Sequence, residues 1–296
     1  MKVLVTGANS LLGDALVRMA PVGVKVEGTY HQANPDEAGP YYWMDLTDPS
    51  TIKYVMNTVK PDIVIHSAAE GNVDLAEKDY KRSYDVNCKG TVSLIKECIP
   101  YSSKFIFIST NAVFDGTKAP YKEYDPLNPI NAYGKIKAEA ERNVWYASSW
   151  FGLDTLIIRP IMLYGWEKVN HRKNWATMVI DKVMRTNQVD MVDDVFCQPT
   201  YVDDAAYAIW KLKDKSSDIF HLASQERLSF YEFALKVATV FGLDKNLIKP
   251  VSIESFKDLA PRPRDTTFDN SKICKDGCIL SDSYEGLYEM KKKRFV

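Results

Sequence analysis

The stretch Val3-Leu4-Val5-Thr6-Gly7-Ala8-Asn9-Ser10-Leu11-Leu12-Gly13 decides the fold expected for this chain. A short apolar run ends at a glycine, and a helical pattern begins directly after it. There Gly7 permits a tight turn beside a phosphate, Gly13 permits close packing of helix on strand, and the helix N-terminus supplies amide donors. Ser10 stands where a third glycine is expected, and its hydroxyl can donate to a phosphate. We expect a phosphate loop, with a plain strand-to-helix turn as the alternative.

Working outward, short apolar runs alternate with longer helical patterns over the first 160 residues, which is typical of a parallel sheet covered on both faces. This rhythm predicts an α/β fold with a Rossmann-type, doubly wound parallel sheet. The expected strands are Val3–Thr6, Val24–Tyr30, Ile63–His66, Phe105–Ser109 and Thr155–Arg159. The expected helices are Leu11–Met19, Thr51–Val59, Tyr80–Ile99 and Tyr133–Ser149.

The rhythm changes after Arg159-Pro160, where a polar and aromatic loop begins. We expect a dinucleotide-binding domain at residues 1–160 and a smaller, discontinuous substrate-binding lobe mainly at 161–296, with segments near 195–223 returning to the first. Helices are expected at Asn174–Thr186, Val202–Leu212 and Ser229–Phe241, and a short strand at Ile219–Leu222. The cluster Lys291–Arg294 is expected to be a solvated tail.

The composition is that of an ordinary soluble enzyme. The chain has 296 residues, 46% of them hydrophobic, and a formal net charge of -1, without the basic excess of a nucleic-acid binder. The short apolar start does not resemble a signal peptide, and no apolar run approaches a membrane span. Five scattered cysteines match neither a disulfide framework nor a metal site. We expect a cytoplasmic protein with reduced thiols and no metal, and a homodimer is left open.

The end of the second expected strand bears on the choice of cofactor. The acid that binds an adenosine ribose hydroxyl belongs about 20 residues after the phosphate loop, but the chain has Gly28-Thr29-Tyr30-His31-Gln32 there. Without a carboxylate to repel a 2′-phosphate, NADP is favoured and NAD remains open. No arginine is present to grip that phosphate. Asp45-Leu46 is suitably placed for the adenine, with a helix-leading turn as the equal alternative.

Tyr133 and Lys137 suggest acid–base chemistry. They lie four residues apart, so in a helix both project from one face, one turn apart. A phenol has a pKa of about 10, and a nearby cation favours its ionised form. Tyr133 can then protonate a carbonyl oxygen as hydride reaches the carbon, while Lys137 can also bind the nicotinamide ribose. Alone, the pattern is more often a surface aromatic beside a solvated lysine.

Ser109-Thr110-Asn111 strengthens that interpretation. It lies at the carboxyl end of the strand that precedes the tyrosine helix, at the edge where open α/β sheets bind their ligands. Thr110 can donate to the same carbonyl oxygen. A hydroxyl at a strand end is usually a turn or cap residue, but three such features in the right order favour a reductase site.

At this point the chain resembles the extended short-chain dehydrogenase/reductase superfamily and, within it, the dTDP-4-dehydrorhamnose reductase family. The resemblance runs over nearly the whole chain, and the Phe-Asp-Gly and Gln-Pro-Thr segments are its specific parts. The segments that carry it are Val5-Thr6-Gly7-Ala8-Asn9 with Gly13, Met44-Asp45-Leu46-Thr47-Asp48, Lys60 to His66, Ala68-Ala69, Val73-Asp74-Leu75-Ala76-Glu77, Val86-Asn87, Gly90-Thr91, Ser109 to Gly116, Tyr133-Gly134-Lys135 with Lys137, Ile158-Arg159-Pro160, Tyr164-Gly165-Trp166, Gln198 to Ala205 and Arg262-Pro263-Arg264-Asp265.

The resemblance implies a reductase that uses NAD(P)H to convert the 4-keto group of a nucleotide-linked deoxysugar to an alcohol. Taken position by position, it makes Thr110, Tyr133 and Lys137 catalytic and Asn87 a buried polar residue behind the site. The expected cofactor contacts are Gly7, Ser10, Leu11, Leu12, Gly13, Tyr30, His31, Asp45, Leu46, Ser67, Ala68, Ala69, Tyr133, Lys137 and Pro160. Two positions depart from the family pattern: Ser10 replaces a glycine, and Asn111-Ala112 stands where Asp-Tyr is frequent, near the sugar pocket.

The second lobe should hold the nucleoside diphosphate. Arg262 and Arg264 flank a proline, and a guanidinium fork matches phosphate oxygens. A solvated basic loop is the equal alternative. Asn111, Trp166 and Gln198 are further expected substrate contacts, each of which plain packing would also explain.

Two other functions remain open. One is a sugar-nucleotide epimerase or dehydratase of the same superfamily, which would show no net oxidation of its cofactor. The other is a non-catalytic, NADP-binding regulatory protein, because the β subunit of methionine adenosyltransferase also resembles these reductases. The fold alone does not separate these readings.

Overall fold

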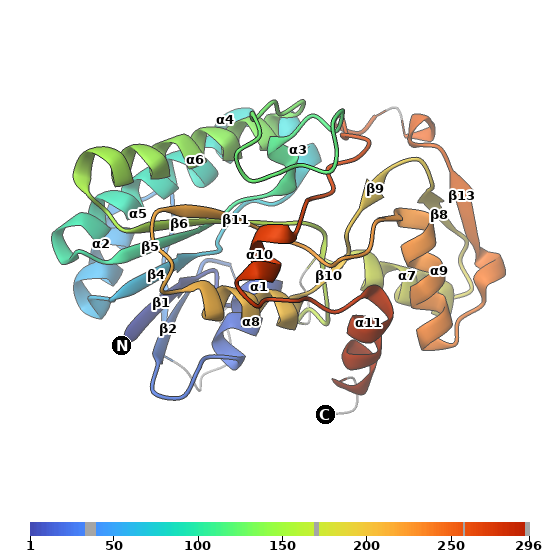
Figure 1. The fold of residues 1–296 in the computed structure, drawn as a ribbon, viewed down its shortest axis with the longest axis horizontal. Coiled ribbons are helices and arrows are strands. Elements are labelled where there is room, and N and C mark those ends of the chain that lie inside the picture. Colours follow the sequence, from blue (N-terminus) through green and yellow to red (C-terminus); the bar gives the residue numbers. More distant parts are fainter. Residues whose placement is uncertain (33–39, 169–171, 257, 294–296) are drawn as a thin grey trace.

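The computed structural model describes residues 1–32, 40–168, 172–256 and 258–293, and its centre is a seven-stranded parallel sheet (Figure 1). The strand order is β11-β6-β5-β4-β1-β2-β3. The strands are β1 (Lys2–Thr6), β2 (Lys25–Tyr30), β3 (Tyr41–Trp43), β4 (Ile63–His66), β5 (Lys104–Ile108), β6 (Thr155–Pro160) and β11 (Asp218–Leu222). This is the Rossmann-type architecture that the sequence predicts.

Helices cover both faces of the sheet because alternate strand residues point to opposite sides. Val3 and Val5 face the helices α1 and α8, whereas Leu4 faces the opposite set. The helices of the first face are α1 (Leu11–Arg18) and α8 (Val202–Leu212), and those of the second are α2 (Pro49–Val59), α5 (Gly90–Cys98) and α6 (Ala132–Phe151). Consecutive buried apolar residues of a strand therefore pack alternately into two hydrophobic cores, one on each face of the sheet.

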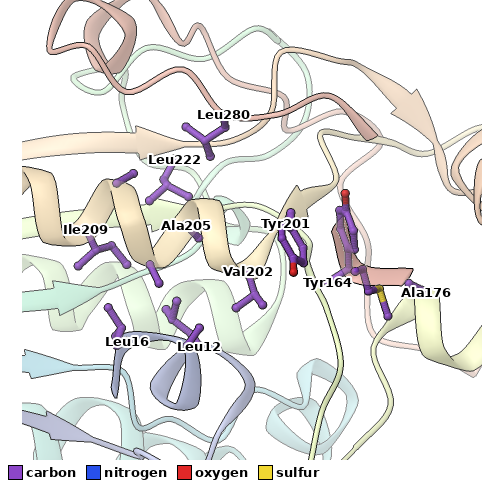
Figure 2. Close-up of a cluster of buried hydrophobic side chains, with 14 of the residues drawn as sticks. Leu12, Leu16, Tyr164, Ala176, Tyr201, Val202, Ala205, Ile209, Leu222 and Leu280 are labelled. Carbon is purple, nitrogen blue, oxygen red and sulfur yellow. The ribbon is translucent and has the colours of Figure 1, made fainter. Parts of the chain in front are cut away.

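The second lobe contains short elements that are paired in small sheets. Its helices and strands are β7 (Leu163–Tyr164), α7 (Trp175–Met184), β8 (Val189–Val192), β9 (Phe196–Cys197), β10 (Thr200–Tyr201), β12 (Leu228–Ser229), α9 (Phe230–Phe241), β13 (Ile248–Val251) and α11 (Ser283–Lys292). The helix α10 (Ser271–Lys275) packs on β11 of the main sheet. Figure 2 shows that the packing of the second lobe continues into that of the sheet: Tyr164 and Tyr201 lie beside Val202 of α8, which packs toward Leu12 of α1. One hydrophobic cluster thus joins the two parts.

At two places the main sheet and its helices differ from the sequence predictions. β3 is an additional edge strand, and β11 confirms the short strand expected to return to the main sheet. The single helix expected at Tyr80–Ile99 is α4 (Tyr80–Tyr84), a π-helical turn at Asp85–Lys89 and then α5. A π-helical turn is rare and continues the α-helix on both sides, so the sequence pattern did not predict it.

The C-terminal lysines are not a solvated tail in the described part of the chain. Lys291 and Lys292 end α11, the Lys291 ammonium donates to the Val240 carbonyl oxygen at 2.6 Å, and Lys293 pairs with Asp203. The amphipathic face of Leu287 and Met290 docks this helix into the core. Arg294 lies outside the described residues.

The topology places the expected site. The chain runs outward from β1 to β2 and β3 on one side, and from β4 to β5 and β6 on the other, so the order reverses between β1 and β4. Ligands of open α/β sheets bind outside the carboxyl ends of the strands at such a reversal. Thr6 and His66 end the two strands in register. Among the described residues, no helix is both long and apolar enough to cross a bilayer.

Candidate active site

The loop after β1 has the tight geometry expected of it. Gly7 has a φ of 66°, in the left-handed region that glycine adopts without strain, and a Cβ there would lie 2.9 Å from the Cα of Ala68. A Cβ on Gly13 would lie 2.0 Å from the Gly7 carbonyl oxygen. The Ala8 amide donates to the Thr29 carbonyl oxygen at 2.8 Å. These contacts hold the main chain against the start of α1.

Ser10 is the N-cap of α1. Its Oγ accepts the Gly13 amide at 3.1 Å, which explains how a serine replaces the expected glycine. Leu11 is half-buried beside Gly165, where a Cβ would lie 3.5 Å from its Cδ1. Leu12 instead faces inward and packs in the core. Of the expected loop contacts, Leu12 is therefore reachable only through its main chain.

His31 and Asp45 lie close together at the carboxyl edge of the sheet. The imidazole Nε2 lies 3.6 Å from Asp45 Oδ2, directly after the neighbouring strands β2 and β3. Burial raises the pKa of Asp45, but hydrogen bonds from Thr47 and the charge of His31 outweigh it and the pKa is lowered. Tyr30 ends β2, and its carbonyl oxygen accepts the Met44 amide. Leu46 packs as a core residue against Gly90 of α5.

His66, at the end of β4, is a buried residue that the sequence analysis did not single out. Its Nδ1 lies 2.8 Å from Thr6 Oγ1, and its Nε2 lies 3.1 Å from Thr91 Oγ1. Because the Thr91 hydroxyl donates to the Asn87 carbonyl oxygen, Thr91 accepts from Nε2 of His66. Burial, aided by the charge of Lys137, lowers the pKa of His66 to about 3. This network fixes the two strand ends at the topological reversal.

The segment after β4 lines the same edge of the sheet. The Ser67 hydroxyl donates to the Thr6 carbonyl oxygen at 2.7 Å, and the Ala68 amide donates to Thr6 Oγ1 at 3.1 Å. Ala69 is exposed. Pro160 ends β6, two strands away from β4. All four expected cofactor contacts therefore lie at carboxyl ends of parallel strands.

Tyr133 is the second residue of α6, and the helix start brings it to Thr110. Asn131 caps the helix by accepting the Gly134 amide at 2.8 Å. A Cβ on Gly134 would lie 2.1 Å from the Ala112 carbonyl oxygen, so only glycine allows α6 to approach the turn after β5 this closely. The Thr110 side chain lies close enough to the Tyr133 hydroxyl to lower the pKa of the phenol. The two residues expected to bind one carbonyl oxygen are adjacent.

The pKa of the Tyr133 phenol is raised, whereas the sequence analysis expected it to be lowered. Burial of the hydroxyl raises the pKa of Tyr133 to about 12, the Thr110 side chain lowers it less, and the charge of Glu70 raises it further. The expected lowering by Lys137 is wrong for this structure, because desolvation outweighs any gain from a nearby cation. At neutral pH the phenol is therefore protonated, the form that donates a proton.

Lys137 lies one turn further along α6 and is fully buried. Its ammonium donates to the Ile108 carbonyl oxygen at 2.7 Å and lies 4.0 Å from the centre of the Phe107 ring. Burial lowers the pKa of Lys137 to about 7, although the negative charge of Glu141 acts in the opposite direction. The alternative of a solvated lysine is wrong.

A buried ion pair extends the polar face of α6. Glu141, one turn beyond Lys137, accepts two hydrogen bonds from Arg159 of β6, at 2.9 Å and 2.6 Å. Both side chains are almost completely buried. Sequence reasoning quoted Arg159 only as part of a motif and missed Glu141. The available signal was the repeat of Tyr133, Lys137 and Glu141 at intervals of four.

Asn87 and Glu70 connect the π-helical turn to the site. Asn87 is buried, and its side chain binds both main-chain groups of Glu70, at 2.8 Å from the amide and 3.0 Å to the carbonyl oxygen. This structural place agrees with the expectation for Asn87. Glu70, whose charge acts on Tyr133, was missed because no motif contains it.

The expected substrate contacts are dispersed. Asn111 Nδ2 donates to Thr266 Oγ1 at 2.5 Å, which places it beside the loop of the second lobe. Gln198 is buried, and its amide binds both main-chain groups of Phe268. The Trp166 indole donates to the Met290 carbonyl oxygen at 2.7 Å. The polar groups of Gln198 and Trp166 thus serve packing, the alternative that the sequence analysis left open.

The two arginines expected to form a diphosphate clamp are held by carboxylates. Arg262 Nη2 lies 2.8 Å from Asp74 Oδ1, and Arg264 pairs with Asp194 and Glu254, each at 2.5 Å. The loop is therefore not simply solvated, and a diphosphate would have to compete with these partners. The sequence of the loop alone gives no signal of these three partners.

The sheet order, the glycine turn after β1 and the positions of Thr110, Tyr133 and Lys137 are those of an extended short-chain dehydrogenase/reductase. The family model described as RmlD substrate binding domain matches residues 1–293. The chain therefore belongs to this family, that of the dTDP-4-dehydrorhamnose reductases.

Individual relatives agree with this assignment. The methionine adenosyltransferase 2 subunit beta of Xenopus tropicalis is 30% identical over 286 residues, which cover 93% of this chain and 82% of that protein. The dTDP-4-dehydrorhamnose reductase of Aggregatibacter actinomycetemcomitans is 27% identical and covers 92% of both chains. The crystal structure of dTDP-4-dehydrorhamnose reductase from Bacillus anthracis in complex with NADP has a TM-score of 0.83 at 28% identity and covers 99% of both chains.

Proposed function

We propose that this protein is an NADP(H)-dependent reductase that converts the 4-keto group of a nucleotide-linked deoxysugar to an alcohol, with Tyr133 as the proton donor. The observation that carries the proposal is the position of Tyr133 beside Thr110 at the start of α6, one helical turn from the buried Lys137. The relatives' reductase names and the NADP complex of the Bacillus anthracis enzyme support the substrate class and the cofactor.

The residues at the sheet edge fit a dinucleotide. Gly7 has no side chain in the path of a phosphate, and α1 begins directly after the same turn, where the first helix amides can bind an anion. Ser109, at the end of β5, has a buried hydroxyl without a hydrogen-bond partner, which a bound group at this edge would satisfy. Gly7 and Ser10 would hold the pyrophosphate, and His31 with Asp45 would lie at the adenosine end. When bound, the reduced nicotinamide supplies the hydride.

The chain's own residues supply the proton and the orientation. The Tyr133 hydroxyl is protonated at neutral pH and can give its proton to the carbonyl oxygen of the substrate. Thr110 donates to the same oxygen, which polarises the carbonyl carbon and fixes the distance to the phenol. Lys137, one helical turn from Tyr133 and bound to the Ile108 carbonyl oxygen, would hold the nicotinamide ribose with its ammonium. One ketone thereby gains a hydride and a proton and becomes one alcohol.

An NADPH-oxidation assay tests the proposal. It uses dTDP-, UDP- and GDP-linked 4-keto-6-deoxyhexoses, with Tyr133→Phe beside the parent and Tyr146→Phe, an exposed tyrosine of the same helix, as the control. We expect stoichiometric oxidation by the parent, loss of at least about 100-fold in Tyr133→Phe, and no change in Tyr146→Phe. Equal rates in Tyr133→Phe and the parent would refute the assignment of Tyr133. Conversion of a sugar nucleotide without net oxidation would favour an epimerase or dehydratase instead.

A second candidate is a non-catalytic, NADP-binding regulatory subunit. It is favoured by 30% identity to the methionine adenosyltransferase 2 subunit beta over 93% of this chain. In that case the purified protein binds NADPH but oxidises none with any of the sugars, and it forms a complex with a methionine adenosyltransferase catalytic subunit. Size-exclusion chromatography of the two purified proteins distinguishes this outcome from the reductase.

A further inference from the structure

The helix α3 (Val73–Lys78) carries two carboxylates that accept hydrogen bonds from two different segments of the chain. Asp74 and Glu77 lie three residues apart, so both face the same side of the helix. They belong to the Val-Asp-Leu-Ala-Glu segment, to which the proposed reaction gives no role.

Asp74 binds the loop that carries the arginines. Its Oδ1 accepts the Ala260 amide at 3.0 Å and Arg262 Nη2 at 2.8 Å. Both side chains of the ion pair are about three-quarters buried, at 25% and 26% exposure. One carboxylate thus fixes both the main chain and the guanidinium of this loop.

Glu77 binds the start of the helix that carries Tyr133. Its Oε2 accepts the amide of Ala132 at 2.8 Å, and Ala132 directly precedes Tyr133. The first amides of a helix have no partner within the helix, and a carboxylate is favourable at this positive end. Glu77 therefore completes the cap of α6 from a separate element.

Asn131 joins the loop and the helix directly. It is almost completely buried, its Oδ1 accepts the Gly134 amide at 2.8 Å, and its Nδ2 donates to the Pro261 carbonyl oxygen at 2.9 Å. The loop at Ala260–Arg262 therefore reaches the N-terminus of α6 along two routes, one through Asn131 and one through α3.

We infer that Asp74, Glu77 and Asn131 are positioning residues that hold the arginine loop of the second lobe and Tyr133 as one unit. This inference rests on the proposed function. A sugar nucleotide that contacts the loop is thereby held at a fixed distance from the Tyr133 hydroxyl. Because a misplacement of about 1 Å can cost about 100-fold in rate, a fixed distance between substrate loop and proton donor has a direct catalytic effect.

The test combines hydrogen exchange with kinetics. The variants are Asp74→Ala, Glu77→Ala and Glu77→Gln, with Lys78→Ala, an exposed residue of the same helix, as the matched control. The amides of Ala132 and Gly134 are bound to side chains, so their exchange reports the cap of α6 without any activity. Thermal melting verifies that each variant is folded.

We expect Asp74→Ala and Glu77→Ala to speed exchange at the start of α6 severalfold, and Lys78→Ala to leave it unchanged. In the assay, Glu77→Ala should lower kcat about tenfold, the effect of about one lost hydrogen bond, with an unchanged KM for NADPH. Glu77→Gln, whose amide oxygen still accepts from Ala132, should recover most of kcat.

Unchanged exchange at Ala132 and Gly134 in both alanine variants would overturn the inference. So would an equal loss of kcat in Glu77→Ala and Glu77→Gln, because the hydrogen bond would then not be the cause. If the parent oxidises no NADPH with any sugar, the proposed function fails and the exchange experiment alone decides the inference.

Discussion

The catalytic face of α6 and the arginine loop at Ala260–Arg264 were both predicted from closely spaced polar residues, and they differ in outcome. On α6, Tyr133 and Lys137 lie where helical spacing puts them, on one face and one turn apart. In the loop, Arg262 and Arg264 turn to different carboxylates, Asp74 on one side and Asp194 with Glu254 on the other. On a helix, the spacing of two residues in the sequence fixes the relative orientation of their side chains. On a loop, that orientation depends on the partners that the fold brings near.

The largest expected effect concerns the buried cation of the helix. Lys137→Met should lower kcat/KM by roughly 10²- to 10⁴-fold, because the buried ammonium one helical turn from Tyr133 is lost. Lys135→Met, an exposed neighbour, should change it little. Steady-state NADPH oxidation measures both, and equal losses would mean that the face of the helix does not matter.

The same variant tests the pKa of Lys137. Burial lowers that pKa from 10.5 to about 7, so between pH 7 and 10.5 the unfolded parent binds more protons than the folded parent. The free energy of unfolding of the parent should therefore gain a contribution as pH rises through this window, and Lys137→Met should lack it. Urea titrations at pH 7 and pH 10 give the difference, and identical slopes in the two proteins would contradict the assignment.

The buried ion pair of α6 should affect stability more than any pair of the loop. Arg159→Met leaves Glu141 buried and uncompensated and should lower the free energy of unfolding by about 3–5 kcal/mol. The double variant Arg159→Met with Glu141→Met removes both charges and should recover most of the loss. Denaturant titrations test this, and a double variant as unstable as the single one would place the cost in packing rather than charge.

The buried His66 at the end of β4 should make the stability of the protein depend on pH. Burial lowers its pKa to about 3, so between pH 6.5 and pH 3 the unfolded chain binds a proton that the folded chain refuses. Stability should fall as pH falls through this window, by about 2–4 kcal/mol from this residue. His66→Asn should flatten the decline, and His31→Asn, on an exposed residue, should not. Denaturant titrations at pH 7, 5 and 3.5 would contradict this if all three proteins decline in parallel.

The smallest effect is expected in the loop. Arg264 is 45% exposed, and Glu254 is 79% exposed, so Arg264→Gln should change the free energy of unfolding by less than about 1 kcal/mol. About 0.5 M NaCl should remove most of that difference by screening. A loss above about 2 kcal/mol that persists in salt would show that the loop pairs behave like the buried pair of α6.

The sequence by itself determined the layered α/β fold and the place of the site. Apolar runs and helical periodicity predicted nearly all strands and helices of the sheet region, because burial on two faces leaves an unmistakable pattern. The spacing of Tyr133 and Lys137 determined their common face, since a helix has a fixed turn. The strand end at Thr110 placed it at the edge where the loop after Gly7 also lies.

Only the tertiary structure decided the partners of side chains that are distant in sequence. It pairs Arg262 with Asp74 and Arg159 with Glu141, and it brings the Glu77 carboxylate to the first amide of α6. It also raises the pKa of Tyr133 through burial, whereas the sequence predicted a lowering by Lys137. The physical reason is that ion pairs, caps and desolvation depend on distances in space between separate elements, whereas periodicity records only which side of one element is buried.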